Sequence, residues 1–215
     1  VAKIFLPQNN KRPDGSYIDP LNGQNYEAGV KAALLGGRLN LGAAIYQLRE
    51  NNKAIAIPDV LAPDGSQAYE GKSGTRTRGF ELEAAGAIRP GWEIAASLAH
   101  NRTQDRDGLR INTAIPKNVA KLFTSYRING LGGLTVGGGV RWQSAIYSDD
   151  MGPNSVRFTQ PSYAVADLMA RYDINDHLSA ALNVHNLFDR RYYTNTGNSY
   201  YGSPRAFVLS LTGRF

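Results

Sequence analysis

Long stretches of strictly alternating apolar and polar side chains constrain this chain more than any other feature of its sequence. Leu178, Ala180, Leu182 and Val184 alternate with polar or small residues, and similar patterns occur at 80–88, 134–143 and 205–215. Alternation with a period of two gives a β-strand one apolar and one polar face. No window of 12 or more residues has apolar residues at helical spacing, so the sequence predicts an all-β fold.

The alternating stretches predict nine strands. Most span ten or more residues, beyond the ~5–6 that are typical of soluble sheets and close to the ~9–11 that cross a bilayer at a tilt. The predicted strands are 24–35, 38–50, 75–88, 92–104, 118–128, 134–147, 162–172, 177–187 and 204–215.

The connections between these strands alternate strictly between short and long. The short ones are tight turns rich in Gly, Asn and Asp, at 35–38, 89–91, 129–133 and 173–176. The long ones are polar, at 51–74, 105–117, 148–161 and 188–203, with a further long segment at 1–23. Outer-membrane barrels have short periplasmic turns and long extracellular loops, so we predict a transmembrane, antiparallel, up-and-down β-barrel.

Aromatic residues are placed as in a membrane girdle. Trp92, Tyr126, Ile128 and Tyr172 fall on the apolar face at the short-turn ends of their strands. Ordinary aromatic enrichment in strands is the alternative explanation.

The polar faces carry charges of both signs, which we expect to pair across neighbouring strands or with material that fills the barrel. A plugged barrel and an open pore are both polar inside, so this feature does not separate them. The charged residues are Glu27, Lys31, Glu81, Glu83, Glu93, Lys121, Arg127, Arg141, Asp167, Arg171 and Arg214.

A closed bacterial barrel with both ends in the periplasm needs an even number of strands, and nine is odd. The chain also begins, at Val1–Phe5, in what the pattern predicts to be an external loop. We therefore interpret residues 1–215 as the C-terminal part of a larger barrel and do not expect them to fold alone.

Composition and motifs argue against enzymes and nucleic-acid binding. The chain has no Cys, its three His are not clustered, and no nucleophile or metal motif has the required spacing. Its 24 Lys and Arg against 18 Asp and Glu form no cluster of the kind that follows a phosphate backbone. Two Pro-Asp-Gly-Ser segments, at 13–16 and 63–66, predict turns at loop tips. We expect no catalytic residue, resident metal or cofactor.

Several segments resemble TonB-dependent outer-membrane receptors. The segment Asn186-Leu-Phe-Asp-Arg-Arg-Tyr-Tyr193, then Gly202-Ser-Pro-Arg205 and a final Phe215, is similar to the end of those receptors. Segments 5–8, 17–20, 25–31, 77–83 and 116–118 are similar to the siderophore-receptor branch, in particular to hydroxamate-type coprogen, alcaligin and ferripyoverdine receptors.

The resemblance implies a 22-stranded barrel closed by a plug, with these nine strands as its last nine and the plug and earlier strands absent from this chain. It implies binding of a ferric siderophore at the extracellular face and import driven by TonB through the plug. Ferric iron would enter only as the chelate. The resemblance also implies contact with the lipid and lipopolysaccharide of the outer membrane, and recognition of Phe215 by the barrel assembly machinery.

Binding residues are expected in the long connections, where tyrosine offers an apolar ring and a hydrogen-bonding hydroxyl. The candidates are Tyr69, Gln143, Tyr147, Tyr200 and Tyr201. Packing of loop aromatics on one another, or anchoring at lipid headgroups, is the alternative for each. A receptor for haem, cobalamin or a sugar, a passive porin and an outer-membrane hydrolase are the alternative functions. The hydrolase would need a Ser/His or Asp/His constellation, and no spacing in the sequence places such residues together on one rim.

Overall fold

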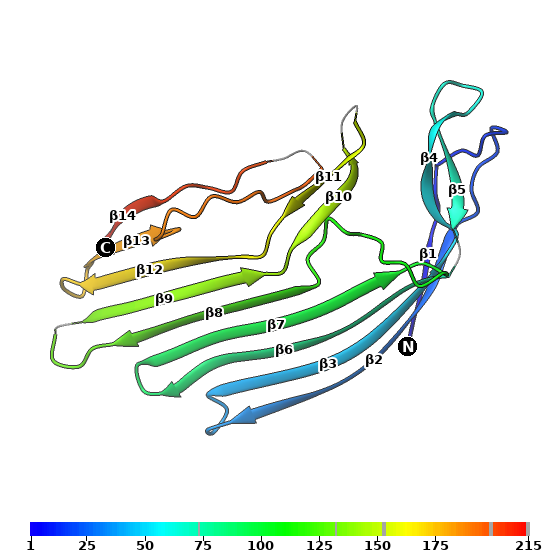
Figure 1. Ribbon diagram of the computed structural model, residues 1–215. Coiled ribbons are helices and arrows are strands. Elements are labelled where there is room, and N and C mark those ends of the chain that lie inside the picture. The colour runs from blue at the N-terminus through cyan, green and yellow to red at the C-terminus, as the bar shows by residue number, and fades with distance from the viewer. Residues whose placement is uncertain (73, 132, 152–153, 198–199, 214–215) are drawn as a thin grey trace. The chain divides into compact units, whose positions relative to one another are not determined.

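The computed structural model describes residues 1–215 except 73, 132, 152–153, 198–199 and 214–215 (Figure 1). All regular elements of this described part are β-strands. It contains no helix that is long and apolar enough to span a membrane.

Ten strands form one sheet in the order β1-β2-β3-β6-β7-β8-β9-β12-β13-β14. Their bounds are β1 Ala2–Leu6, β2 Leu21–Leu34, β3 Leu39–Asn51, β6 Thr75–Arg89, β7 Trp92–Gln104, β8 Asn118–Arg127, β9 Leu134–Gln143, β12 Tyr163–Asp173, β13 Leu178–His185 and β14 Ala206–Gly213.

The nine predicted strands are confirmed as β2, β3, β6, β7, β8, β9, β12, β13 and β14. The count of nine is wrong, because β1 is a further strand of the same sheet. Ala2–Leu6 was predicted to lie in a loop, but it pairs with β2 in the register Ala2↔Asn25 to Leu6↔Leu21. The strand reads Ala-Lys-Ile-Phe-Leu, in which three consecutive apolar residues break the alternation that identifies the other strands.

Two of the predicted loops contain hairpins of their own. Strands β4 (Lys53–Leu61) and β5 (Gln67–Lys72) pair within the 51–74 connection. Strands β10 (Ile146–Met151) and β11 (Val156–Gln160) pair within the connection between β9 and β12. The predicted strand 134–147 therefore ends at Gln143, and Ile146 begins the separate hairpin.

The short connections form the predicted tight turns. In the turn between β2 and β3, Leu35, Gly36 and Gly37 have φ values of 54°, 69° and 85°. Gly91, between β6 and β7, has φ 80°. Gly tolerates positive φ at little cost, which explains its position in these turns.

The chain divides into two compact units. The first comprises 1–29, 44–80 and 101–112, and the second comprises 30–43, 81–100 and 113–215. Few apolar side chains are buried in the described part of the chain. Ile18, Leu21 and Ala68 are buried in the first unit, and Ile146 and Val165 in the second.

In the second unit, strand register aligns the apolar side chains in rows across one face of the sheet. One row joins Ala96, Leu122, Val140 and Ala166 through the pairings of β7, β8, β9 and β12. Another continues from Leu182 of β13 to Leu209 of β14. Leu122 is 44% exposed and Leu209 is 71% exposed, so this apolar face packs against nothing in the described part of the chain. Below we call it the outer face.

Two of the residues predicted to form an aromatic girdle, Trp92 and Tyr126, lie together at the turn between β6 and β7. Trp92 and Tyr126 are cross-strand partners, and Trp92 Nε1 donates to Thr124 Oγ1 at 2.8 Å. The Arg89 guanidinium lies 5.1 Å from the Trp92 ring centroid and 5.4 Å from that of Tyr126. Cation–π contact places a charge beside two amphipathic rings, the combination that favours a membrane–water interface.

The opposite face of the sheet, which we call the inner face, carries charged side chains. Some of the charged residues that were predicted to pair across strands do so. Asp167 lies 3.9 Å from Arg141 and 3.9 Å from His185, and its Oδ1 accepts from the Asn186 backbone N–H at 2.8 Å. Arg127 and Arg171 pair with Asp173 at 3.8 and 3.0 Å. Arg214, named with this set from the sequence, lies outside the described residues, and so does Phe215.

Candidate functional site

The connection between β13 and β14 is organised by one buried amide. Asn186, 1% exposed, donates from Nδ2 to the carbonyls of Arg190 and Ser203 at 2.9 and 3.0 Å. Its Oδ1 accepts from the Arg190 backbone N–H at 2.8 Å. The side chain thus joins the two ends of the loop, and the Arg205 backbone N–H adds a bond to Asp189 Oδ1 at 3.0 Å.

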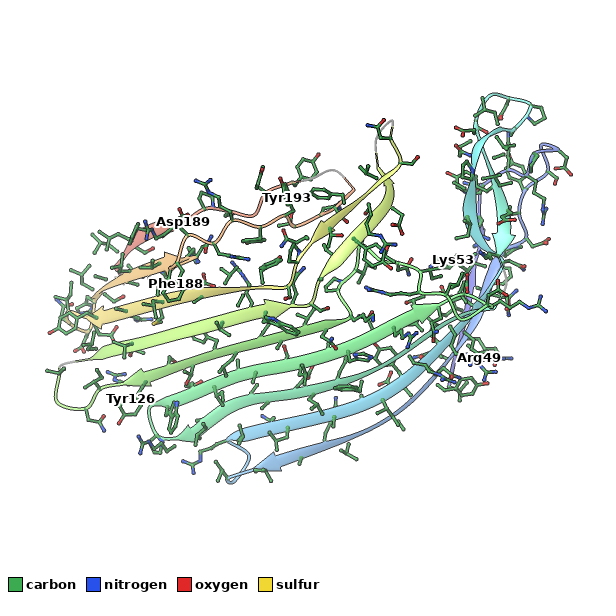
Figure 2. The ribbon with its side chains drawn as sticks, viewed as in Figure 1. Arg49, Lys53, Tyr126, Phe188, Asp189 and Tyr193 are labelled. Carbon is green, nitrogen blue, oxygen red and sulfur yellow. The ribbon has the colours of Figure 1, made fainter. Side chains whose placement is uncertain are left out.

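Three aromatic rings in successive contact connect this loop to the β10–β11 hairpin. They belong to Tyr201, Tyr193 and Phe158, which we call the aromatic stack. The rings of Tyr193 and Tyr201 have centroids 4.4 Å apart, and their hydroxyl oxygens are 2.8 Å apart. Phe158 packs edge-on against Tyr193 at 5.0 Å. Figure 2 shows Tyr193 extending from the loop, with Phe188 and Asp189 nearer the end of β13. The hydrogen bond with Tyr201 raises the pKa of Tyr193.

The stack is fixed to the hairpin by polar contacts as well. Gln160, 5% exposed, accepts from the Tyr193 backbone N–H through Oε1 at 2.8 Å. The hydroxyls of Ser148 and Thr196 are 2.7 Å apart. Ser148 and Phe158 are register partners, so both belong to the face of the hairpin that contacts the loop.

Tyr147 belongs to the other face of this hairpin, since side chains alternate along a strand. The Arg157 guanidinium lies 4.2 Å from the Tyr147 ring centroid, and its Nε donates to Asp149 Oδ1 at 2.6 Å. Hydrogen bonding to Asp149 raises the pKa of Arg157. Tyr147 therefore has a cation and a carboxylate beside it, whereas Tyr201 has aromatic neighbours.

A second aromatic pair supports the base of the loop. The rings of Tyr163 and Tyr192 stack at 4.3 Å with an interplanar angle of 25°. The Gly202 backbone N–H donates to the Tyr192 carbonyl at 2.9 Å. A Cβ at position 202 would overlap the Tyr192 ring, so this close approach requires glycine.

Of the five residues proposed from the sequence, four belong to the second unit and Tyr69 to the first. Tyr201 joins the aromatic stack and Tyr147 the opposite face of the hairpin. Tyr200 is 64% exposed and its carbonyl accepts from the Thr194 backbone N–H at 2.8 Å. Gln143 is half-buried at the end of β9, in register with Tyr163. Tyr69 lies in β5 of the first unit, where its backbone N–H donates to the Lys11 carbonyl at 2.8 Å.

Sequence reasoning did not propose Tyr193, Phe158 or Arg157 as site residues. Tyr193 was considered only as the last residue of the Asn186–Tyr193 motif. Like the four proposed tyrosines, however, it lies in a long connection between strands. No sequence signal pairs Phe158 or Arg157 with those tyrosines, because the hairpin that carries them was predicted to be a loop.

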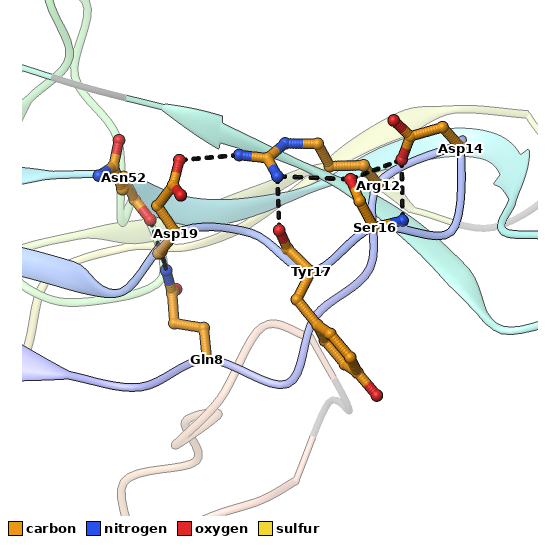
Figure 3. Close-up of polar contacts among 7 residues, drawn as sticks. All are labelled: Gln8, Arg12, Asp14, Ser16, Tyr17, Asp19 and Asn52. Carbon is orange, nitrogen blue, oxygen red and sulfur yellow. Dashed lines mark hydrogen bonds and ion pairs between the residues drawn. The ribbon is translucent and has the colours of Figure 1, made fainter.

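In the first unit, the N-terminal connection is held by a polar network (Figure 3). Arg12 donates to the Tyr17 carbonyl at 2.5 Å and to Asp19 Oδ2 at 3.0 Å. Gln8 Nε2 donates to the carbonyls of Asp19 and Asn52 at 2.8 and 2.6 Å, which joins this connection to the start of the β4–β5 hairpin.

The two Pro-Asp-Gly-Ser segments form the predicted turns and lie together. In each, the aspartate Oδ1 accepts from the serine backbone N–H, at 2.8 Å for Asp14 and 3.2 Å for Asp64. Lys11 Nζ is 2.6 Å from Asp64 Oδ2, and a Cβ on Gly15 would be 3.4 Å from the Pro63 ring. Hydrogen bonds from Lys11 and Ser66 hold the pKa of Asp64 well below its usual range.

Within the described residues, no group of three or more His, Asp or Glu side chains is placed to hold a metal ion. The site instead offers rings, hydroxyls and a guanidinium on loops that are fixed by buried amides. Such groups suit recognition of an organic ligand.

Comparison with known proteins agrees with this architecture. Residues 2–187 match the family model described as TonB dependent receptor-like, beta-barrel. The chain is 42% identical over 218 residues to the ferric-pyoverdine BN7/BN8 receptor of Pseudomonas putida, an alignment of 100% of this chain and 26% of that protein. It is 40% identical over 228 residues to the ferripyoverdine receptor of Pseudomonas aeruginosa, covering 99% of this chain and 28% of the receptor.

The solved structures include the pyoverdine outer membrane receptor of Pseudomonas aeruginosa bound to pyoverdine. It superimposes with a TM-score of 0.90 at 38% identity and covers 100% of this chain and 33% of that chain. This chain therefore spans between a quarter and a third of the length of these relatives. The match over residues 2–187, together with the shared sheet, shows that the chain belongs to the TonB-dependent receptor-like β-barrel family.

Proposed function

We propose that this chain is part of an outer-membrane receptor that binds a ferric siderophore at its extracellular face and imports it with energy transmitted by TonB. One observation carries the proposal: the whole chain aligns at 42% identity with a ferric-pyoverdine receptor. The proposal concerns the complete receptor, of which these residues form about a quarter to a third in the relatives.

The exposed apolar rows on the outer face support the membrane location. Side chains such as Leu122, Leu182 and Leu209 are 41 to 71% exposed. Burying apolar surface away from water is favourable by about 25 cal/mol per Å², and lipid provides that environment over the height of a bilayer. The short turns then face the periplasm and the long connections face outward.

The long connections supply the ligand site. A siderophore coordinates its ferric iron with its own oxygen atoms. The receptor therefore needs to bind the organic part of the chelate, and the metal is transported as part of the substrate. The aromatic stack offers the exposed ring and hydroxyl of Tyr201, supported by the half-buried rings of Tyr193 and Phe158. The Tyr147–Arg157 pair offers a ring beside a cation. Tyr69, Gln143, Tyr147, Tyr200 and Tyr201 remain the proposed binding residues, to which we add Tyr193, Phe158 and Arg157.

Further partners follow from this assignment. TonB would act through an N-terminal plug that lies outside this chain. Phe215 would be read by the barrel assembly machinery, and lipid and lipopolysaccharide would surround the wall. We propose no enzymatic activity, since the relatives are receptors.

The experiment is ligand titration of the purified full-length receptor in detergent, followed by intrinsic Tyr and Trp fluorescence. The panel holds a ferric pyoverdine, other ferric hydroxamates, ferric catecholates, haem and cobalamin. Nanomolar-range quenching by a pyoverdine or hydroxamate supports the proposal. Tight binding of haem or cobalamin alone would replace the ligand class. Ion conductance in planar bilayers without a tight ligand would point to a porin.

A further inference from the structure

Tyr193 and Tyr201 face each other where the two arms of the β13–β14 connection pair locally in antiparallel fashion. They form an isolated bridge. Two backbone hydrogen bonds to the facing arm flank this bridge, one from the Thr194 N–H at 2.8 Å and one from the Gly202 N–H at 2.9 Å. This is the non-hydrogen-bonded position of an antiparallel pair, at which the Cα atoms approach most closely and the side chains meet. The backbone thus opposes two tyrosines that are 8 positions apart in sequence.

The two rings converge toward the edges that carry their hydroxyl groups. The ring centroids are 4.4 Å apart with an interplanar angle of 31°, whereas the hydroxyl oxygens are 2.8 Å apart. The ring carbons ortho to the hydroxyl belong to this edge, because each is bonded to the carbon that bears the oxygen. These ortho carbons are the atoms at which two tyrosyl radicals couple.

An oxidant in solution reaches this pair through Tyr201, which is 67% exposed. Tyr193 is half-buried, but a hydrogen bond joins its hydroxyl to that of Tyr201. A radical on Tyr201 can take the hydrogen atom of the Tyr193 hydroxyl along this bond, after which Tyr201 is oxidised a second time. One exposed phenol therefore gives an oxidant access to both rings.

A second tyrosine pair in the same unit has the proximity without the access. The rings of Tyr163 and Tyr192 stack with centroids 4.3 Å apart. Tyr192 is only 7% exposed, however, and Tyr163 is half-buried. Burial keeps an oxidant in solution away from this pair, so it serves as an internal comparison for a reaction at Tyr193 and Tyr201.

We propose that Tyr193 and Tyr201 are a site of oxidative dityrosine cross-linking, at which a haem peroxidase with hydrogen peroxide joins the two rings by a carbon–carbon bond. Each phenol gives up one electron and one proton, and the two radicals form the bond between their ortho carbons. The proton on each coupled carbon then moves to its oxygen, which restores both phenols. The chain loses two hydrogen atoms in all, and hydrogen peroxide takes up two electrons and two protons to give two molecules of water.

The test treats the purified full-length receptor in detergent, without siderophore, with a haem peroxidase and hydrogen peroxide. Trypsin cleaves after Arg191 and Arg205, so a single peptide, 192–205, carries both tyrosines. Mass spectrometry should find this peptide lighter by two hydrogen atoms. Its fragment spectrum should lack the separate fragments that arise from backbone cleavage between positions 193 and 201, because the new bond holds the two parts together.

Three variants locate the bond. Tyr193→Phe and Tyr201→Phe each remove one phenol and keep the ring, so the yield of the lighter peptide should fall at least about tenfold, since neither retains two phenols held in contact. Tyr200→Phe is the matched control for the cross-link, because Tyr200 is 64% exposed and adjacent in sequence to Tyr201. It should give as much of the lighter peptide as the unmodified receptor.

Persistence of the lighter peptide in Tyr201→Phe, or its disappearance in Tyr200→Phe, would assign the bond to other rings and overturn the proposal. An unchanged peptide 192–205 in the unmodified receptor, while the same peroxidase couples free tyrosine, would also overturn it. Covalent dimers on a denaturing gel without the lighter peptide would reject it too, since the exposed phenols would then react only between molecules. The assay contains no siderophore, so none of these outcomes bears on the proposed function.

Discussion

Tyr201 lies against Tyr193 with ring centroids 4.4 Å apart and hydroxyl oxygens 2.8 Å apart, so one loop tyrosine orients the other. Tyr201 remains 67% exposed in this arrangement. A rigid ring that is held in place but open to solvent loses little conformational entropy when a ligand covers it.

Replacing Tyr201 by alanine should weaken binding of a ferric pyoverdine by the full-length receptor about tenfold, because the variant removes an aromatic contact and leaves Tyr193 without its partner. Tyr201→Phe should cost about threefold, since it keeps the ring and loses one hydrogen bond. Fluorescence titration measures both. Tyr172→Phe, on the outer face, serves as the control, and an unaltered affinity of Tyr201→Ala would remove the aromatic stack from the site.

Tyr147 and Tyr201 should act independently, because Tyr147 projects from the face of the β10–β11 hairpin opposite to the one that contacts the loop of Tyr201. The affinity losses of Tyr147→Ala and Tyr201→Ala should add in the double variant to within about 0.5 kcal/mol. A double-mutant cycle on siderophore binding measures the coupling. A coupling energy above about 1 kcal/mol would mean that both tyrosines contact one ligand group.

Asn186→Ala should loosen the loop between β13 and β14. The change leaves the Arg190 and Ser203 carbonyls and the Arg190 backbone N–H without their side-chain partner, at about 1–3 kcal/mol for each buried group left unsatisfied. We expect faster trypsin cleavage at Arg190 and Arg191 in the full-length receptor. Asn186→Asp keeps one acceptor oxygen but turns a second, negatively charged oxygen toward the Arg190 and Ser203 carbonyls in a buried site, so it should loosen the loop at least as much as alanine. Cleavage at the unmodified rate in the alanine variant would show that other contacts hold the loop.

Gly202→Ala should separate Tyr192 from Tyr163, since the added methyl group would occupy the place of the Tyr192 ring. A weaker siderophore affinity and faster proteolysis of the loop are expected, with overpacking costing about 1–3 kcal/mol. Gly42→Ala is the matched control, because its Cβ would meet Glu83 at an ordinary 3.8 Å. Identical behaviour of the two variants would argue against a tight approach at Gly202.

The contact between the two loop tips of the first unit should persist from about pH 4 to about pH 10. The lowered pKa of Asp64 contributes stability above its unfolded value of about 3.9, and this is lost only as pH falls through the folded value. The raised pKa of Lys11 contributes stability below its unfolded value of about 10.4, and this is lost as pH rises through the folded value.

Hydrogen exchange of segments 10–17 and 60–68, corrected for the intrinsic rate, should therefore show equal protection at pH 5 and pH 8. Asp64→Asn should lower that protection at both values, and Asp107→Asn should leave it unchanged. A clear difference between pH 5 and pH 8 in the unmodified receptor would contradict the ion pair as the cause.

The sequence by itself determined the strands, the face of each strand and the alternation of short turns with long connections. Alternation such as Leu178, Ala180, Leu182 and Val184 has a period of two, which is a local property, and the turns carry their own signal in residues such as Gly36 and Gly91. Nine of the ten strands of the sheet followed from these local patterns. Only β1 did not, because its consecutive apolar residues Ile4, Phe5 and Leu6 do not alternate with polar ones.

Tertiary structure alone decided the conformation of the long connections. The packing of the β10–β11 hairpin against the loop of Tyr193 and Tyr201 depends on contacts between residues distant in sequence, and that packing leaves Tyr147 on the opposite face of the hairpin. Gln160 with Tyr193 and Ser148 with Thr196 are 33 and 48 positions apart. Such contacts leave no period in the sequence, since a loop takes its shape from the particular hydrogen bonds that satisfy its backbone when the strands on either side are already in place.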